Sequence, residues 1–117
     1  MEIWHNPRCT KSRAAKAALD EAGLDYTERR YLDEPPTEQE LDAVLTKIGK
    51  EPWEVARLKE PIAQELGLKS LDHDRARWLA LMAANPVLIE RPIIITDDGR
   101  ALVARDPQAV QTALDTA

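Results

Sequence analysis

The sequence predicts an α/β fold (of the α+β kind, with a mixed sheet) in which a β-α-β unit is followed by helices and then by a β-β-α unit. Three observations support this prediction. The chain has 117 residues, of which 44% are hydrophobic, which is enough for one domain with one core. Strand-like and helix-forming stretches alternate at both ends of the chain. The middle of the chain carries helix signals only.

A strand over residues 1–5 and a helix over residues 12–22 are expected to open the chain. An Asn-Pro turn signal separates them, and the helix is rich in Ala, Leu, Lys and Glu. Gly23 is expected to end this helix in the left-handed conformation. Residues 24–32 contain two tyrosines and a threonine and stop before a pair of prolines, so they predict a second strand.

Four helices are predicted in the middle of the chain. Thr37 and Glu40 have the spacing of a capping box, and Gly49 is expected to close the helix that they open. Two short helices and a longer one are expected to follow, over residues 52–58, over residues 61–66, and from a cap at Asp72 to Asn85.

A hairpin and a final helix are predicted at the end of the chain. Residues 93–96 and 101–103 are strand-like, and the Asp98-Gly99 pair between them is a type I′ turn signal. Asp106, followed by a proline, is the expected N-cap of a helix that runs to about residue 115.

The order of these elements resembles a known fold. Without the helical block it is β-α-β-β-β-α, the connectivity of a thioredoxin/glutaredoxin-like domain. We therefore expect residues 1–117 to form a single thioredoxin-like domain with a helical insertion at about 36–88. Because unrelated activities share such folds, the connectivity alone does not define a function.

Composition excludes several classes of protein. The single cysteine, Cys9, rules out an internal disulfide, and together with two histidines it cannot form a paired-cysteine zinc site, so no metal is expected. The 16 basic and 21 acidic residues give a net charge of -5, which argues against nucleic acid as a partner. Without a signal peptide or a long apolar run, the chain is expected to be cytoplasmic and to have no membrane partner.

Cys9 stands where the first predicted strand meets the first predicted helix, and its surroundings favour a thiolate. The free N–H groups at a helix start stabilise a negative sulfur, as do the nearby cations Arg8, Lys11 and Arg13. His5 can add a proton or a hydrogen bond. The alternative is a buried, unreactive cysteine, but the polar and cationic neighbourhood argues against it.

The same loop suits a phosphate-shaped oxyanion, because amides at a helix start and arginines bind such anions. Ser12 can either cap the helix or bond the thiolate, and capping is favoured. Because residue 12 is a serine, it cannot resolve a mixed disulfide at Cys9, and an external thiol must do so.

An ordered set of motifs resembles the glutaredoxin-dependent arsenate reductase family. The motifs are His-Asn-Pro-x-Cys-x-x-Ser-Arg at 5–13, Tyr-Leu-x-x-Pro-Pro at 31–36, Glu-Leu-Gly-Leu at 65–68, and Asn-Pro-x-Leu-Ile-x-Arg-Pro-Ile at 85–93. The resemblance implies that Cys9 attacks an oxyanion, arsenate, with help from His5. It also implies glutaredoxin as a partner, glutathione as co-substrate and no bound cofactor.

The resemblance further implies that three arginines, Arg57, Arg91 and Arg105, bind the oxyanion. Arg100 competes with Arg105 for this role, because the hairpin is one residue longer than in the family. Pro92 matches a cis-proline that faces the cysteine in thioredoxin-like folds, and with Ser12 it completes the expected substrate-binding set.

Two alternatives remain open on the sequence alone. One is a glutathione-dependent thiol–disulfide oxidoreductase with no arsenate activity. The other is a non-catalytic regulator, similar to family members that bind RNA polymerase. Ser12 counts against the regulator, because such proteins often use a two-cysteine switch.

Overall fold

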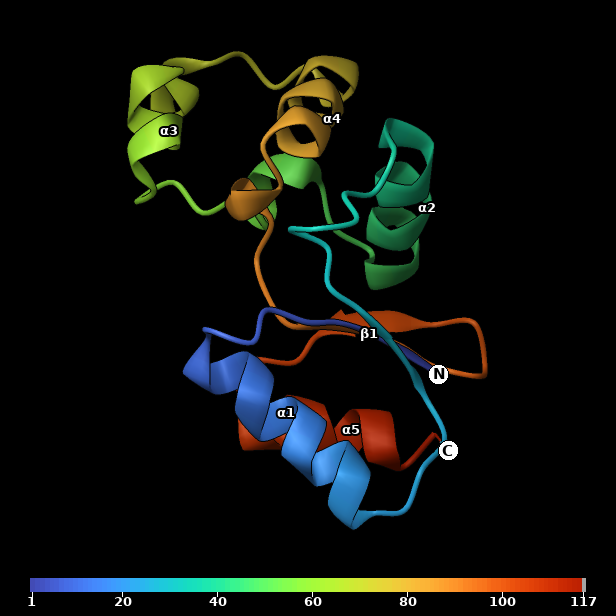
Figure 1. Ribbon diagram of the computed structural model, residues 1–117. Helices are drawn as coiled ribbons and strands as arrows, with labels where there is room; N and C mark the ends of the chain where they lie inside the picture. Colours follow the sequence, from blue (N-terminus) through green and yellow to red (C-terminus); the bar gives the residue numbers. More distant parts are fainter. Residues whose placement is uncertain (117) are drawn as a thin grey trace. The chain divides into compact units, whose positions relative to one another are not determined.

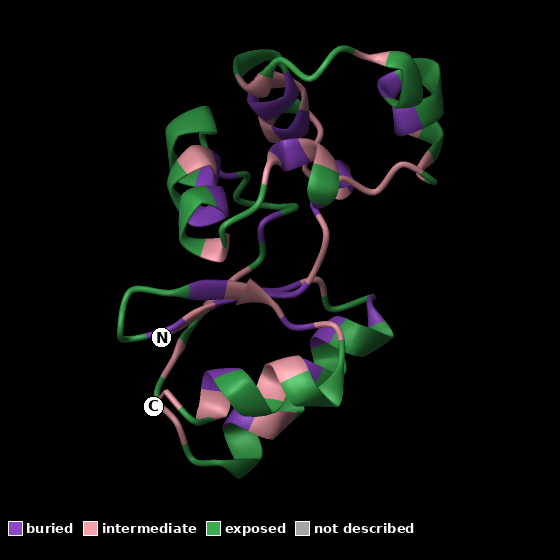
Figure 2. Ribbon diagram, turned by 180° about the vertical axis from the view of Figure 1, so that it is seen from behind, coloured by how far each residue is buried: buried purple, intermediate pink, exposed green. Residues whose placement is uncertain are grey.

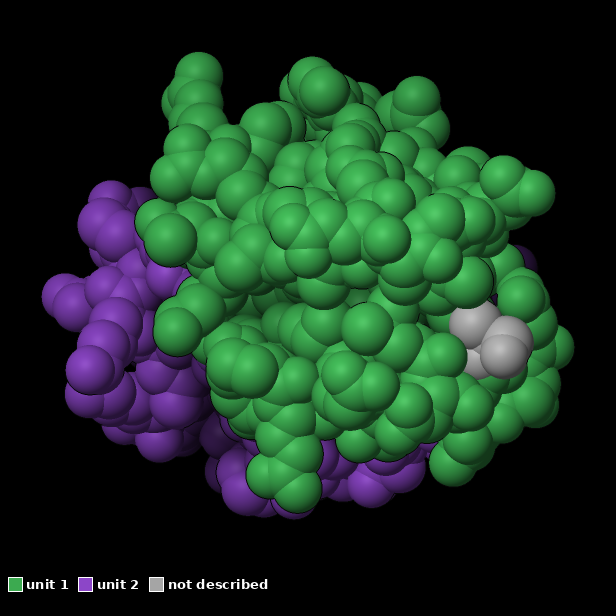
Figure 3. Space-filling model, turned by 90° about the horizontal axis from the view of Figure 1, so that it is seen from below, with its two compact units in different colours: residues 1–34, 91–117 green, residues 35–90 purple. Residues whose placement is uncertain are grey.

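The ends of the chain and its middle form separate units in the structure, a computed structural model that describes residues 1–116. Met1–Glu34 and Arg91–Ala117 make up the first, the sheet unit, and Pro35–Glu90 make up the second, the helical unit (Figure 3). The segment expected as an insertion, at about 36–88, lies within the helical unit.

The strands of the sheet unit pair in the order β2-β1-β3-β4 (Figure 1). The central strand β1 (Glu2–Trp4) runs parallel to β2 (Thr27–Arg29) and antiparallel to β3 (Ile93–Ile95). β3 also pairs with β4 (Ala101–Val103), again antiparallel. The parallel pair β1–β2 needs a crossover, which α1 provides, whereas the antiparallel pair β3–β4 needs only a short turn. The predicted α/β fold with a mixed sheet is confirmed.

Two helices lie side by side on one face of this sheet (Figure 1). α1 (Thr10–Glu21) is the crossover between β1 and β2, and α5 (Pro107–Leu114) follows β4. Figure 2 shows buried stretches along the sheet and in both helices. They belong to a core of small and aliphatic side chains: Ile3, Ala15, Leu19, Ile94, Ala104 and Ala113. Because this core fixes β1 against α1, it also fixes the loop that joins them.

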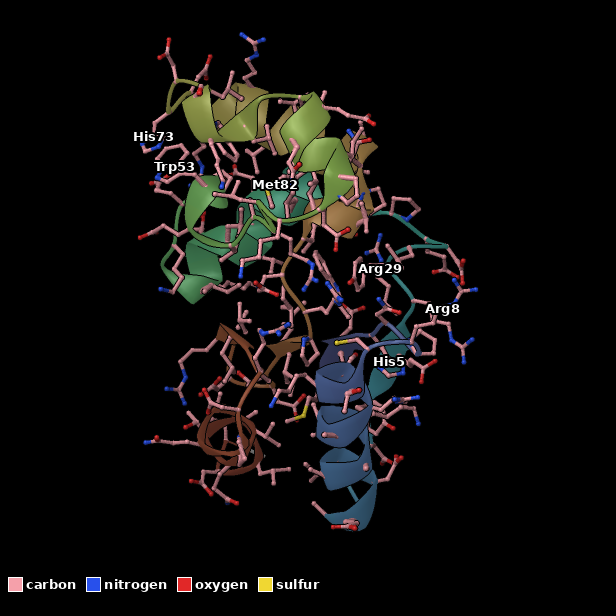
Figure 4. All side chains as sticks on the ribbon, turned by 90° about the vertical axis from the view of Figure 1, so that its left-hand side faces the viewer. His5, Arg8, Arg29, Trp53, His73 and Met82 are labelled. Atoms are coloured by element: carbon pink, nitrogen blue, oxygen red, sulfur yellow. The ribbon has the colours of Figure 1, made fainter. Side chains whose placement is uncertain are left out.

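The helical unit contains α2 (Glu38–Ile48), α3 (Pro61–Glu65) and α4 (Arg75–Ala84), and α2 packs against α4. Short 3₁₀ turns complete it, at Pro52–Glu54, Leu68–Ser70 and Pro86–Leu88. Trp53 and His73 stack within this unit, with ring centroids 4.2 Å apart (Figure 4).

Capping signals in the sequence are confirmed at two helices. Thr37 and Glu40 form the predicted capping box, with each backbone N–H donating to the other side chain at 3.1 Å. Gly49 ends that helix with φ +80°, the left-handed conformation that glycine adopts without strain. Asp106 accepts a hydrogen bond from the Ala109 N–H at 2.8 Å and caps α5.

The structure corrects three boundaries. The strand expected over 24–32 is limited to β2, because the chain turns at Arg30, whose carbonyl accepts two backbone hydrogen bonds. The helix expected over 52–58 ends at residue 54, because the backbone beyond it pairs with residues 88–90. The Asp72 carbonyl accepts from the Trp78 indole and the Asp74 N–H, so Asp74 is the N-cap of α4 instead.

The predicted type I′ turn of the hairpin is wrong. A type I′ turn needs a positive φ at both central residues, but Gly99 alone has one here, at +84°, whereas Asp98 does not. The Gly99 N–H donates to the Thr96 carbonyl and the Thr96 N–H to the Arg100 carbonyl. The connection is therefore a three-residue loop that ends in a left-handed glycine.

Candidate functional site

Cys9 is the N-cap residue of α1, at the junction that the sequence predicts. Its backbone is extended (φ -94°, ψ 123°), its N–H donates to the Asn6 carbonyl at 3.0 Å, and its carbonyl accepts from the Arg13 N–H at 2.9 Å. The residue is 9% exposed. The helix therefore starts at Thr10, two residues earlier than expected, and Cys9 lies directly in front of the free N–H groups of the first turn.

Several hydrogen bonds to the Cys9 sulfur favour its thiolate form. Burial raises the pKa of the Cys9 thiol, but the bonds from the Ser12 backbone N–H and the Arg91 side chain outweigh it. The Arg91 charge and the Lys11 backbone N–H act in the same direction, so the pKa lies below the ordinary value. Arg91 is thus the cation at the sulfur. The cations expected from the sequence, Arg8, Lys11 and Arg13, are exposed residues instead.

The lowered pKa of Cys9 predicts the pH dependence of its alkylation. We expect the rate of reaction with iodoacetamide to rise with pH and to level off at a lower pH than in the urea-unfolded chain, because only the thiolate reacts and the fold lowers the pKa of the Cys9 thiol. The measurement is the rate of carbamidomethylation of the native protein at a series of pH values. A midpoint equal to that of the urea-unfolded chain would contradict it.

Sheet pairing explains why Arg91 reaches Cys9 from the far end of the chain. Trp4, the last residue of β1, pairs with Ile93, the first residue of β3. In this antiparallel register the loop that leaves β1 and the segment that enters β3 lie at the same edge of the sheet. That segment is Arg91-Pro92, and the peptide bond between its two residues is cis, as the resemblance implied.

The Ser12 hydroxyl orients His5 instead of capping the helix. His5 Nδ1 and Ser12 Oγ are 2.6 Å apart, and the Asn6 N–H donates to the same oxygen at 3.0 Å. Both side chains are buried, with His5 at 3% and Ser12 at 0% exposed. The favoured capping role is therefore wrong, because Cys9 already occupies the N-cap and Ser12 lies inside the first turn. Of Ser12, only the backbone N–H bonds the sulfur.

The fold favours the neutral form of His5. Burial lowers the pKa of His5, which Glu28 opposes, while Lys16 and Arg30 lower it further. Its ring lies near the start of α1 (Figure 4), where Nδ1 meets the Ser12 hydroxyl. The sequence left open a proton or a hydrogen bond from His5 to the thiol, but among the described residues the hydrogen bond of its ring goes to Ser12.

The lowered pKa of His5 predicts a loss of stability in mild acid. The unfolded chain takes up a proton on this histidine near pH 6.5, whereas the folded chain does so only at lower pH, so acid favours unfolding between the two values. We expect the unfolding free energy of His5→Asn to fall less than that of the wild type between about pH 7.5 and about pH 5.5. Urea denaturation at both pH values measures this difference, and an equal fall in both proteins would contradict it.

Arg105 lies beside Arg91, and Arg100 does not. Arg105 Nη1 donates to the Arg91 carbonyl at 3.0 Å, and the Ala104 N–H donates to the Pro92 carbonyl at 2.8 Å. The Arg100 side chain is 62% exposed and pairs with Asp98 at 2.8 Å in the hairpin loop. The sheet unit therefore brings together Cys9, Arg91 and Arg105.

Arg57 belongs to the helical unit and is held there by two carboxylates. Its Nε donates to Glu60 and its Nη1 to Glu90, both at 3.1 Å, and its backbone N–H donates to the Leu88 carbonyl. About a quarter of the side chain is exposed, at 23%.

The sheet unit thus combines a nucleophile with an anion site. A low-pKa thiol, a guanidinium and the backbone N–H groups of a helix start converge at the end of β1. Sequence reasoning assigned Arg91 to the substrate only and missed its bond to the sulfur, since no local pattern joins two residues so far apart in the chain.

Comparison with known proteins gives a family for this chain. The model of the ArsC family matches residues 4–113. An uncharacterized protein in the glnII region of Streptomyces viridochromogenes is 49% identical over 117 residues, covering 97% of this chain and 98% of that one. An arsenate reductase of Neisseria meningitidis serogroup B is 37% identical over 115 residues, covering 97% of both chains.

A solved arsenate reductase from Vibrio cholerae is similar in structure as well, with a TM-score of 0.87 at 32% identity, over 100% of this chain and 98% of that one. This likeness confirms the predicted thioredoxin-like fold. Because the family model and the relatives cover almost the whole chain, the protein belongs to the ArsC family, the family of the arsenate reductases.

Proposed function

We propose that this protein reduces arsenate to arsenite with Cys9 as the single nucleophile and with glutathione and glutaredoxin as external thiols. The observation that carries the proposal is the Cys9 sulfur, which accepts a hydrogen bond from Arg91 and lies at the start of α1. Family membership supports arsenate as the substrate, and the absence of a second cysteine from the sequence supports an external reductant.

In the first step the Cys9 thiolate attacks arsenic, and an arsenate oxygen leaves as water after taking up protons. As the sulfur–arsenic bond forms, the negative charge moves from sulfur to the arsenate oxygens. Arg91 then exchanges a bond to sulfur for one to oxygen, and the Arg105 guanidinium beside it adds a second cation. We include Arg57 and the ring of Pro92 in the substrate site on the resemblance alone.

Two further steps release the product. Glutathione replaces a second arsenate oxygen, so that arsenic carries the Cys9 sulfur and the glutathione sulfur. A glutaredoxin thiolate then attacks the glutathione sulfur, the sulfur–arsenic electron pair passes to arsenic, and As(V) becomes As(III). Water finally displaces arsenite from Cys9, which returns to the thiol. The two electrons that arsenic gains come from the glutaredoxin and glutathione thiols, which are left joined as a disulfide.

We also propose that the protein works in the cytoplasm, where glutathione is kept reduced. Within residues 1–116, none of the helices combines the length and the apolar character that a membrane crossing requires.

A coupled assay tests the proposal. Purified protein is mixed with glutathione, glutaredoxin, glutathione reductase and NADPH, and the oxidation of NADPH is followed when arsenate is added. We expect oxidation to depend on all the added components. If arsenate has no effect while a glutathionylated peptide is reduced, the protein is a thiol–disulfide oxidoreductase instead.

The arginine pair in the hairpin provides a matched comparison. We expect Arg105→Ala to raise the KM for arsenate about tenfold, the effect of losing one charge-assisted contact, because its guanidinium lies beside Arg91. Arg100→Ala should leave KM unchanged, because Arg100 bonds to Asp98 in the loop. Steady-state kinetics of the two variants measures this, and equal effects would remove Arg105 from the site.

A further inference from the structure

A cavity of about 380 Å³ opens beside the turn that carries Cys9. Residues 5–8 form one wall, and Arg30, Leu32 and Asp33, which follow β2, form the other. All of these residues belong to the sheet unit. The volume lies within the range of about 300–1,000 Å³ that is usual for small-molecule sites.

The cavity is lined by charged residues of both signs, and some of these form no ion pair among the described residues. The Arg8 guanidinium forms no hydrogen bond or ion pair with any residue in the described part of the chain, and its side chain points away from the loop in Figure 4. Arg30 is 56% exposed and shares its guanidinium with Glu28 at 2.8 Å. The Asp33 carboxylate forms no ion pair within residues 1–116, and, after the larger effect of Glu28, its charge raises the pKa of Arg30.

The apolar part of the cavity is also exposed. Leu32 is 38% exposed, one of two large hydrophobic side chains that stand open to solvent among the described residues. Together with Pro7 it gives the cavity an apolar part beside the charged residues of its lining. An occupant that matches this wall carries carboxylates, an ammonium group and a short carbon chain between them.

The turn that lines the cavity is also the turn that holds the nucleophile. Arg8 immediately precedes Cys9, and the Cys9 N–H donates to the Asn6 carbonyl at 3.0 Å, which closes the turn. A molecule anchored on Arg8 is therefore held next to the residue that reacts with thiols.

We propose that this cavity binds the charged ends of an anionic peptide thiol of the glutathione type, with Arg8 and Arg30 on its carboxylates and Asp33 on its ammonium group. The proposal rests on the proposed function, in which such a thiol attacks the adduct on Cys9. It adds that the thiol is bound from a defined side before it reacts, and that its charges select it over neutral thiols.

Thiol–disulfide exchange without arsenate tests this proposal. The Cys9 thiolate attacks oxidised glutathione, the disulfide bond of the reagent breaks, a mixed disulfide forms on Cys9, and one glutathione leaves as thiolate. The rate is measured by mass spectrometry and compared with that for 2-hydroxyethyl disulfide, which carries no charge. We expect the wild-type rate to saturate with oxidised glutathione and to rise linearly with the neutral disulfide.

The variant pair is Arg8→Glu and Arg13→Glu. Both replace an exposed arginine near Cys9 and change the charge equally, but Arg8 lines the cavity and Arg13 does not. We expect Arg8→Glu to lower the ratio of the two rates about tenfold, as the loss of a charge-assisted contact does, and Arg13→Glu to change it less than about twofold. Equal effects of the two variants, or no effect of Arg8→Glu, would overturn the proposal.

A binding measurement gives a second, independent test. Cys9→Ser is titrated with S-methylglutathione, which cannot react, and amide shifts are followed by NMR. Amide shifts at Asn6, Arg8, Leu32 and Asp33 support the cavity, whereas shifts elsewhere or none contradict it. Neither experiment contains arsenate, so a protein inactive in the coupled assay but selective here would overturn the proposed function and leave the cavity standing.

Discussion

Cys9→Ser should reduce arsenate turnover by at least about a thousandfold, because it removes the nucleophile and a serine hydroxyl does not ionise near neutral pH. Hydrogen bonds from Ser12 and Arg91 lower the pKa of the Cys9 thiol, whereas a hydroxyl in its place would carry no charge. The coupled assay with arsenate, glutathione and glutaredoxin measures the loss.

The same substitution should leave the fold intact, which separates a chemical effect from unfolding. Cys9 is the N-cap of α1 and its side chain makes no capping hydrogen bond. Serine is one of the preferred N-cap residues, so we expect the unfolding free energy to stay equal or to rise by up to about 1 kcal/mol. Urea denaturation measures this change. Turnover that survives in a folded Cys9→Ser protein would exclude Cys9 as the nucleophile.

Arg91→Ala should have the second largest effect, for two separate reasons. The Arg91 side chain donates a hydrogen bond to the Cys9 sulfur and places its charge beside it, so its loss should raise the pKa of the thiol toward the ordinary value. The same guanidinium is the proposed partner of the arsenate oxygens. We expect kcat/KM for arsenate to fall about 10- to 100-fold, the effect of one lost charge-assisted contact.

The alkylation profile separates the two reasons. Iodoacetamide needs only the thiolate, so its rate in Arg91→Ala at neutral pH reports the pKa of Cys9 without any oxyanion. Arg91→Lys is the matched control. Lysine keeps the charge but lacks the planar guanidinium, which can donate hydrogen bonds to the sulfur and to an arsenate oxygen at the same time. An unshifted alkylation midpoint in Arg91→Ala would show that the helix start alone holds the thiolate.

Local signals were sufficient for the helix ends. Thr37 with Glu40, Gly49 and Asp106 act within one turn of the chain, and the structure confirms each of them. Local signals did not predict the length of β2 or the turn type of the hairpin. β2 is shorter than expected because the chain turns at Arg30. Asp98 lacks a positive φ because Thr96 pairs with Arg100, which leaves a loop of three residues instead of two.

The sequence by itself determined the chemistry of the site. It placed one cysteine at a helix start and put a serine where a second thiol could stand, which makes an external thiol necessary if Cys9 is oxidised. These are local or compositional facts, and folding does not change them.

Only the tertiary structure decided which groups meet the cysteine. The pairing of Trp4 with Ile93 brings Arg91 to the sulfur, and the β3–β4 pairing brings Arg105, not Arg100, to the Arg91 carbonyl. The nearby cations in the sequence belong to exposed residues, where water already stabilises their charge. A guanidinium delivered by sheet pairing meets a largely buried thiolate, and in that low-dielectric setting its hydrogen bond and charge count most.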